Sequence, residues 1–240
     1  MLHSMLRAAT RKNYYETVMV DSPVAYWRLG ESSGTAVVNE VGSGNGTYYG
    51  VTLNQSGALA SDSNTAISFD GTNDYVALPT MSPLSDTFSY EMWFRTTWVT
   101  TDTGNRQYLN TRQQDPSSAA TYTFIERQGG LIAGDITEFQ YYIGSGERES
   151  LTSNVKVLAN TWYHFVCVGD GTGAQMYLNG VEVASSTNAP VSTAVSEHLL
   201  GWRSDAQGDD WFGGLIDEYS VYDYALSPNR IEAHYNAGTT

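Results

Sequence analysis

The chain has 240 residues, of which 41% are hydrophobic and only 16% charged, and it contains 23 glycines and 17 tyrosines. Such a composition is typical of many short, half-buried strands joined by tight turns, and the length suits one large all-β domain. The formal net charge of −14 argues against nucleic acid as a ligand, because the phosphates would be repelled. No stretch approaches the roughly 18 consecutive apolar residues of a spanning helix, so we expect no membrane span.

The first residues differ in charge from the remainder of the chain. Residues 1–12 hold three of the 12 basic residues and none of the 26 acidic ones. Apolar side chains recur there at helical spacing, which predicts a short, basic, amphipathic helix. Because so short a helix is marginal alone and terminal arms usually fray unless held, we expect it to dock on a neighbouring chain or, alternatively, on its own domain. We assign residues 1–18 to this N-terminal arm and residues 19–240 to the folded domain. The expected docking residues are Leu2, Met5, Leu6, Arg7, Arg11 and Lys12.

Strand and turn signals recur after the arm. An apolar run over residues 24–29 predicts the first strand, and Asp70-Gly71 predicts a turn between two further strands. In residues 88–95 every second side chain, from Phe88 to Phe94, is apolar. Successive side chains of a strand point to opposite faces, so we expect this apolar face to contact the core.

The C-terminal third carries the clearest local signals. Asn179-Gly180 predicts a type I′ hairpin, because this pair tolerates positive φ angles. Residues 215–222 predict a last long strand, followed by a helix that is capped by Ser227, begins with Pro228 and ends at Gly238. The sequence therefore predicts an all-β, antiparallel β-sandwich with a short N-terminal arm and a short C-terminal helix.

Short motifs follow one another in a fixed order along the chain: Asp21–Thr35, Asn45–Tyr48, Ser68–Gly71, Asp74–Val76, Trp162–Phe165, Tyr177–Gly180, Gly214–Glu218 and Tyr222–Ser227. This ordered set resembles the laminin G-like domains of the concanavalin A-like type. The resemblance implies a jelly-roll sandwich of two curved sheets that binds carbohydrate or protein, commonly with a calcium ion at its rim. Similar domains also occur in bacterial surface proteins and in bacteriophage head or tail proteins.

A calcium site is the first candidate site. Calcium takes about six to eight oxygen ligands, which closely spaced Asp and Asn side chains supply. Asp70, Asn73 and Asp74 lie within one turn, and Asp217 lies in the closing motif. We therefore predict a structural Ca²⁺ ion held by these four residues. The alternative is that Asp70-Gly71 is only a turn, in which both residue types are common. Asn39 stands where the family usually has an aspartate, which would weaken a site that used that charge.

A sugar-binding surface is the second candidate site. It would need aromatic rings exposed in loops, with polar groups beside them to orient hydroxyls. Trp98, Tyr108, Trp202 and Trp211 lie in or near polar loops, and we predict them as ligand-binding residues. The alternative is that any of these rings belongs to the core, as we expect for Trp27 in the first strand.

Catalytic residues are not expected. A glycosidase of the concanavalin-like class would be expected to place two carboxylates two residues apart on one strand face, because acid and nucleophile must flank the scissile bond. Glu91 alternates with Trp93 and Arg95 on one strand face, and Asp217 alternates with Tyr219, so neither belongs to a close acidic pair. The histidines lack metal-binding spacing, and no phosphate loop or Gly-x-Ser-x-Gly elbow is present. We therefore predict a protein that is not an enzyme.

The predicted function is that of a non-enzymatic virion accessory protein, a bacteriophage head decoration or tail component. Its arm would dock on other virion proteins, and its sandwich would face outward on the virion surface and adhere to host-surface glycans. The motivation is a basic arm on an acidic, solitary sandwich that lacks the continuous apolar core of a Sec signal. The alternative is a calcium-dependent carbohydrate-binding lectin module of a bacterial surface protein, at the cell surface or outside the cell. A homo-oligomer is compatible with both.

Overall fold

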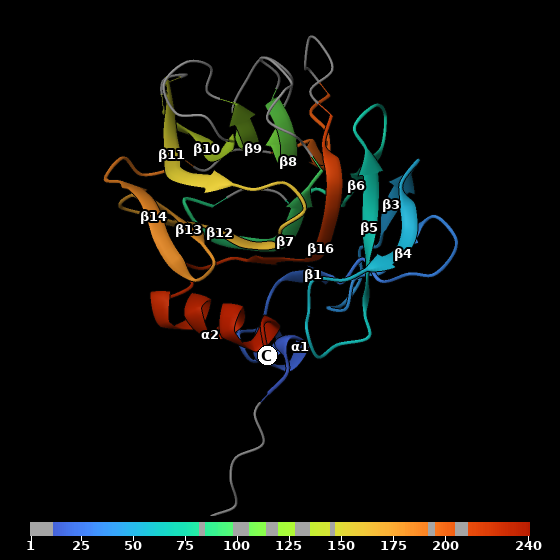
Figure 1. The fold of residues 1–240 in the computed structure, drawn as a ribbon. Coiled ribbons are helices and arrows are strands. Elements are labelled where there is room, and N and C mark those ends of the chain that lie inside the picture. Colours follow the sequence, from blue (N-terminus) through green and yellow to red (C-terminus); the bar gives the residue numbers. More distant parts are fainter. Residues whose placement is uncertain are drawn as a thin grey trace, which may run out of the picture.

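The computed structural model describes residues 12–81, 85–97, 106–113, 120–127, 135–144, 147–191, 195–204 and 211–240. In this part of the chain two eight-stranded sheets stack face to face (Figure 1), and every strand pair in them is antiparallel. The predicted antiparallel β-sandwich is therefore confirmed. Trp98 and the arm residues Leu2, Met5, Leu6, Arg7 and Arg11 lie outside the described residues.

The first sheet has the order β14-β13-β12-β7-β16-β5-β4, and β1 pairs with β16. In its middle, the neighbours β12, β7, β16 and β5 are distant in sequence, as in a jelly roll, and the first strand, β1, pairs with the last strand, β16. Its strands are β1 (Ala25–Trp27), β4 (Thr52–Ser56), β5 (Thr65–Asp70), β7 (Thr87–Thr96), β12 (Tyr163–Asp170), β13 (Ala174–Leu178), β14 (Val181–Ser186) and β16 (Gly213–Tyr222).

The second sheet has the order β11-β10-β9-β8-β15-β6-β3-β2. Its short strands β3, β6 and β15 lie side by side and support the candidate site described below. Its strands are β2 (Ala36–Val37), β3 (Gly46–Tyr49), β6 (Tyr75–Ala77), β8 (Arg106–Gln113), β9 (Ala120–Arg127), β10 (Asp135–Gly144), β11 (Glu147–Val157) and β15 (Glu197–Leu200).

The main core lies between the two sheets. Phe88 and Phe94 of β7 pack there with Trp27 of β1 and Leu200 of β15, so the predicted alternation of β7 is confirmed. The opposite face of β7 is also buried, because Trp93 belongs to a second apolar cluster under the helices. Burial on both faces explains why β7 is buried almost without interruption.

The predicted turns are present. Asn179 and Gly180 connect β13 to β14 with φ angles of 53° and 78°, the left-handed values that a type I′ turn requires. Gly71, with a φ of 79°, follows β5 and opens the turn into β6. The lone Cys167 is buried in β12, and burial raises the pKa of its thiol.

Two helices cover the outer face of the first sheet. α2 (Pro228–Gly238) follows Ser227 and begins with Pro228, as predicted, but the Ser227 side chain makes no capping hydrogen bond. α1 (Tyr14–Val20) was not predicted; Asn13 caps it through its own side chain and the Glu16 carboxylate, in a capping box. The helices lie side by side beneath the strands (Figure 1). Among the described residues, neither helix has the length and apolar character needed to cross a bilayer.

The predicted boundary between residues 18 and 19 falls inside α1. Tyr14 and Val18 are fully buried against the second cluster, so this helix packs as part of the sandwich. We expect deletion of residues 1–11 to leave the free energy of unfolding unchanged. Deletion of residues 1–20 should lower it by about 3 kcal/mol or more, because two large apolar side chains are lost. Urea unfolding of both truncated chains tests this, and equal stability of the two would contradict it.

Candidate functional site

Two aromatic rings meet where β3 ends and β6 begins. Tyr49 is the last residue of β3 and lies directly opposite Tyr75, the first residue of β6. Side chains directly opposite in an antiparallel pair share a face and contact each other. Their rings are stacked, with centroids 4.4 Å apart and planes 6° from parallel.

A second stacked pair forms beside the first. The chain leaves β15 at Gly201, and the N–H of Phe212 donates to the Gly201 carbonyl over 2.9 Å. This bond brings the adjoining residues, Trp202 and Trp211, next to each other although they are separated in the sequence. Their rings stack with centroids 4.6 Å apart and planes 6° from parallel.

Tyr75 joins the two pairs into one surface. Its ring centroid lies 5.2 Å from that of Trp202 and 6.3 Å from that of Trp211. Tyr49 is 44% exposed, and the other three rings are partly exposed. We call Tyr49, Tyr75, Trp202 and Trp211 the aromatic platform. Contiguous apolar surface open to solvent is uncommon and marks a place where another molecule binds.

Polar residues adjoin the platform residues in the sequence. Asp74 precedes Tyr75, and its Oδ2 accepts from the N–H of Asp70 over 2.9 Å. Burial raises the pKa of the Asp74 carboxyl, and the Asp70 charge raises it further. Arg203 follows Trp202, and Ser204 donates to Glu197. Hydroxyl, carboxylate and guanidinium groups thus lie along the same chain segments as the rings.

The structure brings together Trp202 and Trp211, two of the four residues predicted to bind a ligand. Tyr108 differs, because its side chain is fully buried and cannot offer a ring face to a ligand. The Arg203 guanidinium lies over that ring, 5.4 Å from its centroid, and Nη1 donates to the Tyr108 hydroxyl over 2.9 Å. Trp98 lies outside the described residues.

The four predicted calcium ligands do not converge. Asp70 Oδ1 accepts from the N–H groups of Thr72 and Asn73, as an aspartate does in a turn. Asp217 lies in the middle of β16, four residues beyond Gly213, the partner of Asp70. Four strand residues span about 13 Å, which is too far for a shared ion. In the described part of the chain, no group of three or more Asp, Glu, His or Cys side chains is placed to hold a metal ion.

Gly201 directly follows β15 and precedes the platform residue Trp202. Its φ is 84°, and a Cβ there would lie 2.4 Å from the Phe69 ring. We expect Gly201→Ala to lower the free energy of unfolding by about 2 kcal/mol or more, from backbone strain plus overpacking. Gly34→Ala is the matched control, since Gly34 has a φ of 89° and nothing within 4 Å of the added Cβ. Equal losses in urea unfolding would show that the contact with Phe69 has no role.

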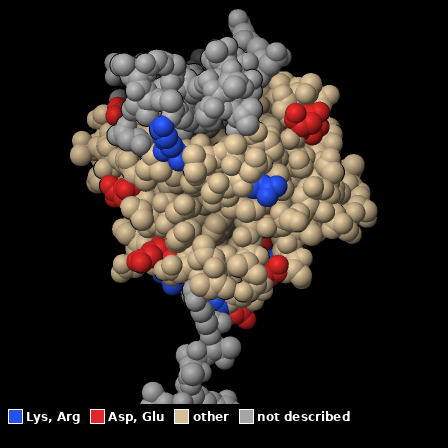
Figure 2. Space-filling model, in the orientation of Figure 1, with Lys and Arg blue, Asp and Glu red and all other residues tan. Residues whose placement is uncertain are grey.

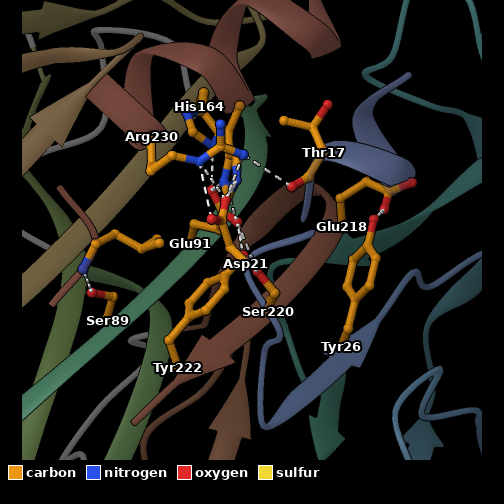
Figure 3. Close-up of polar contacts among 12 residues, drawn as sticks. Thr17, Asp21, Tyr26, Ser89, Glu91, His164, Glu218, Ser220, Tyr222 and Arg230 are labelled. Carbon is orange, nitrogen blue, oxygen red and sulfur yellow. Dashed lines mark hydrogen bonds and ion pairs between the residues drawn. The ribbon is translucent and has the colours of Figure 1, made fainter. Parts of the chain in front are cut away.

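A buried set of titratable groups lies away from the platform, between β7 and the helices (Figure 3). Glu91 Oε1 accepts from Tyr222 over 2.6 Å and from His234 Nδ1 over 2.9 Å, while Oε2 contacts His164 Nε2 over 2.9 Å. His234 Nε2 contacts Asp21 Oδ2 over 2.7 Å. Because both nitrogens of His234 face carboxylate oxygens, both must donate, and this imidazole is positively charged.

The pKa shifts of this set agree with its geometry. Burial alone would raise the pKa of Glu91, but the two histidines hold it well below 4.5. Burial alone would lower the pKa of His234, but the Glu91 and Asp21 carboxylates hold it above 6.5. Burial lowers the pKa of His164. Arg230 belongs to the same set, because its Nη2 lies 2.7 Å from Asp21 Oδ2.

A second buried set explains the position of Asp217. Its Oδ2 accepts from the N–H of Ala58 over 2.8 Å and so holds the chain before β5. The next residue, Glu218, has a φ of 55° in a bulge of β16 and pairs with Arg28 Nη2 over 2.6 Å. Tyr26 donates to the same carboxylate (Figure 3). Burial and the Glu218 charge raise the pKa of Asp217 well above 3.8.

The sequence pattern of the Concanavalin A-like lectin/glucanases superfamily matches residues 70–232, which is more than half of the chain. The chain belongs to this superfamily. The matched span of this concanavalin A-like domain contains three of the four platform residues, Tyr75, Trp202 and Trp211. A search of curated proteins found no match.

Solved structures share the concanavalin A-like fold. Domain 4 of AbnA, a GH43 extracellular arabinanase from Geobacillus stearothermophilus, in complex with arabinotriose, has a TM-score of 0.61 and 22% identity over 89% of this chain and 98% of that one. The binding domain of Paraclostridial Mosquitocidal Protein 1 has a TM-score of 0.69 and 14% identity over 90% of this chain and 52% of that one. The botulinum neurotoxin serotype D ligand-binding domain, in complex with N-acetylneuraminic acid, has a TM-score of 0.64 and 14% identity over 90% and 51%. This chain thus spans about half of each toxin domain, and at these identities the likeness concerns the fold alone.

Proposed function

We propose that this protein is a carbohydrate-binding module that holds a glycan on the aromatic platform. The observation that carries the proposal is the union of two stacked pairs, Tyr49 with Tyr75 and Trp202 with Trp211, on one partly exposed surface. The faces of sugar rings present C–H groups that pack against aromatic rings, and neighbouring polar groups orient the hydroxyls. Binding of arabinotriose and N-acetylneuraminic acid by proteins of this fold supports the same class of ligand.

Charge favours a neutral glycan over an acidic one. The chain carries a net charge of −14, and Asp70, Asp74 and Glu197 lie in the segments next to the platform. Arg203, the cation nearest to Trp202 in sequence, already contacts Tyr108. Figure 2 shows a face on which charged side chains are few and scattered. Uncharged hydroxyls avoid the repulsion that a carboxylated sugar would meet.

We propose binding without catalysis. In the described part of the chain the closest groupings of carboxylates and histidines, around Glu91 and around Glu218, are buried, and their oxygens already accept hydrogen bonds from the protein. A catalytic acid must instead reach the scissile bond of a bound sugar.

A glycan array tests the proposal. The full chain is applied beside the Trp202→Ala/Trp211→Ala double variant, and each is applied with and without a chelator. We expect the full chain to bind one group of neutral glycans and the double variant to lose that group. No binding by the full chain, or equal binding by both, would contradict the proposal. Loss of binding with the chelator would support the calcium requirement predicted from the sequence, at a site other than the four residues predicted for it.

The virion accessory role is our second proposal. It is favoured by the charge of residues 1–12, which hold three of the 12 basic residues and none of the 26 acidic ones. Lys12, one of the predicted docking residues, is exposed just before α1. Such a segment would dock on an acidic partner in a virion or, alternatively, at a bacterial surface. We expect the full chain to co-purify with its source particle and the chain lacking residues 1–11 to remain free; co-purification of both would contradict docking by the arm.

A further inference from the structure

Polar side chains occupy part of the space between the two sheets. Asn110 and Arg112 of β8 are 0% and 3% exposed. By register, Arg112 lies opposite both Thr121 of β9 and His198 of β15, so the three share one face of the second sheet. This face is the inner one, because His198 Nε2 lies 2.8 Å from the hydroxyl of Tyr219 in the opposite sheet.

Several of these polar atoms have no hydrogen-bond partner in the protein. Nη2 of Arg112 donates to the carbonyl of Met81 over 3.1 Å, but its Nε has no partner. The Thr121 hydroxyl is also buried without a partner, and the buried Asn110 amide has no partner besides the Tyr219 hydroxyl. Buried polar groups are nearly always hydrogen-bonded, and an unpaired cluster indicates a bound water or ion.

The charge of Arg112 favours a bound ion over a bound water. No ion pair of Arg112 is present in the described part of the chain. Burial lowers its pKa, and its charge contributes, after burial, to the low pKa of His198. His198 supplies no negative charge, and its ring nitrogens lie close to Pro79 and Tyr219. A buried guanidinium without a counter-charge is costly, and a water molecule would satisfy its N–H without neutralising it.

We propose that a small monovalent anion of the size of chloride binds between the sheets, where it accepts hydrogen bonds from Arg112 Nε, the Thr121 hydroxyl and the Asn110 amide. The three donors come from neighbouring positions of β8 and β9, and Arg112 also lies opposite β15. β15 leads directly to Gly201 and Trp202. Anion binding therefore stabilises the part of the second sheet that supports the aromatic platform.

Thermal unfolding of the full chain tests this proposal. Chloride is varied at constant ionic strength, with gluconate as the replacing anion. Because the site exists only in the folded state, we expect Tm to rise with chloride concentration. Thr121→Val removes one donor to a charged ligand and should shift this dependence to about tenfold higher chloride. Thr123→Val is the matched control, since its hydroxyl contacts Tyr90 over 2.6 Å, and it should keep the chloride dependence.

Two results would overturn the proposal. One is a Tm of the unmodified chain that does not respond to chloride, with Thr121→Val only raising stability by removing an unpaired hydroxyl. The other comes from crystals grown with bromide, in which we expect an anomalous peak within hydrogen-bond distance of Arg112 Nε. Density without an anomalous signal at that position would identify a water and contradict the anion, whether or not the variants fold.

Discussion

Replacing Glu91 by glutamine is expected to lower the free energy of unfolding by about 3 kcal/mol or more. Removing one partner of a buried charge pair leaves the other charge uncompensated, which typically costs about 3–5 kcal/mol. Glu91 is fully buried, and it contacts the positively charged His234 as well as Tyr222 and His164. The glutamine has the same size but only one acceptor oxygen, and its NH₂ group would face donors.

Urea unfolding followed by tryptophan fluorescence measures this loss. Glu182→Gln is the matched control, because Glu182 lies exposed on β14 and accepts only a long hydrogen bond, 3.4 Å, from the Tyr177 hydroxyl. We expect the control to change stability by less than about 0.5 kcal/mol. A similar small change for Glu91→Gln would contradict the interpretation that this cluster holds the helices on the sheet.

The same cluster predicts how stability depends on pH. The pKa of His234 is raised above 6.5, so its contribution is complete below that value and is lost as pH rises through the folded-state pKa. The pKa of Glu91 lies well below 4.5, so its contribution is complete above that value and is lost as pH falls through the folded-state pKa. The lowered pKa of His164 has the opposite effect to the raised pKa of His234: below pH 6.5 it lowers the free energy of unfolding.

We therefore expect His234→Gln to cost most between about pH 4.5 and 6.5, with the difference from the unmodified chain shrinking as pH rises further. Asp21 and Glu91 contact the substituted side chain, and Arg230 contacts Asp21. Urea unfolding of both chains at a series of pH values gives the difference directly. A difference that grows with rising pH would show that His234 is neutral in the folded protein.

Replacing Trp202 by alanine is expected to weaken glycan binding about thirtyfold or more, which corresponds to about 2 kcal/mol. Trp202 contacts two of the other three platform rings, Trp211 at 4.6 Å and Tyr75 at 5.2 Å. Its loss removes one ring and the support of two others. Tyr49→Ala should have a smaller effect, because Tyr49 lies at the end of the platform and contacts only Tyr75 within it.

Isothermal titration with the best ligand from the glycan array measures both variants. Trp162→Ala is the control, since Trp162 is also partly exposed but lies under Arg95, away from the platform. We expect the control to bind normally. Equal weakening by Trp162→Ala and Trp202→Ala would indicate that general loss of stability, and not loss of the platform, lowers affinity.

Much of the fold could be predicted from local patterns. The alternation from Phe88 to Phe94 gave the core face of β7, and Asn179-Gly180 gave the hairpin between β13 and β14. The opposite face of β7 could not be predicted in the same way. It carries Glu91, whose burial depends on helices at both ends of the chain, and α1 was not foreseen because its seven residues are stabilised mainly by packing.

The candidate site was predictable only in part. Trp202 and Trp211 stood out as aromatic residues in polar loops, and they do meet. Tyr49 and Tyr75 gave no such signal, because each lies in a strand and their contact depends on the pairing of β3 with β6. The calcium prediction grouped Asp217 with Asp70 on the assumption that the first and last strands bring them close. In the structure Asp217 lies four residues further along β16 than Gly213, the partner of Asp70.

The central claim, that a glycan binds the aromatic platform, is tested most directly by the indole N–H signals of the six tryptophans in an NMR titration with the best array ligand. We predict that the signals of Trp202 and Trp211 shift together and saturate, while those of the buried Trp27 and Trp93 stay in place. Saturable binding that leaves Trp202 and Trp211 unshifted would place the ligand elsewhere on the sandwich and contradict the account.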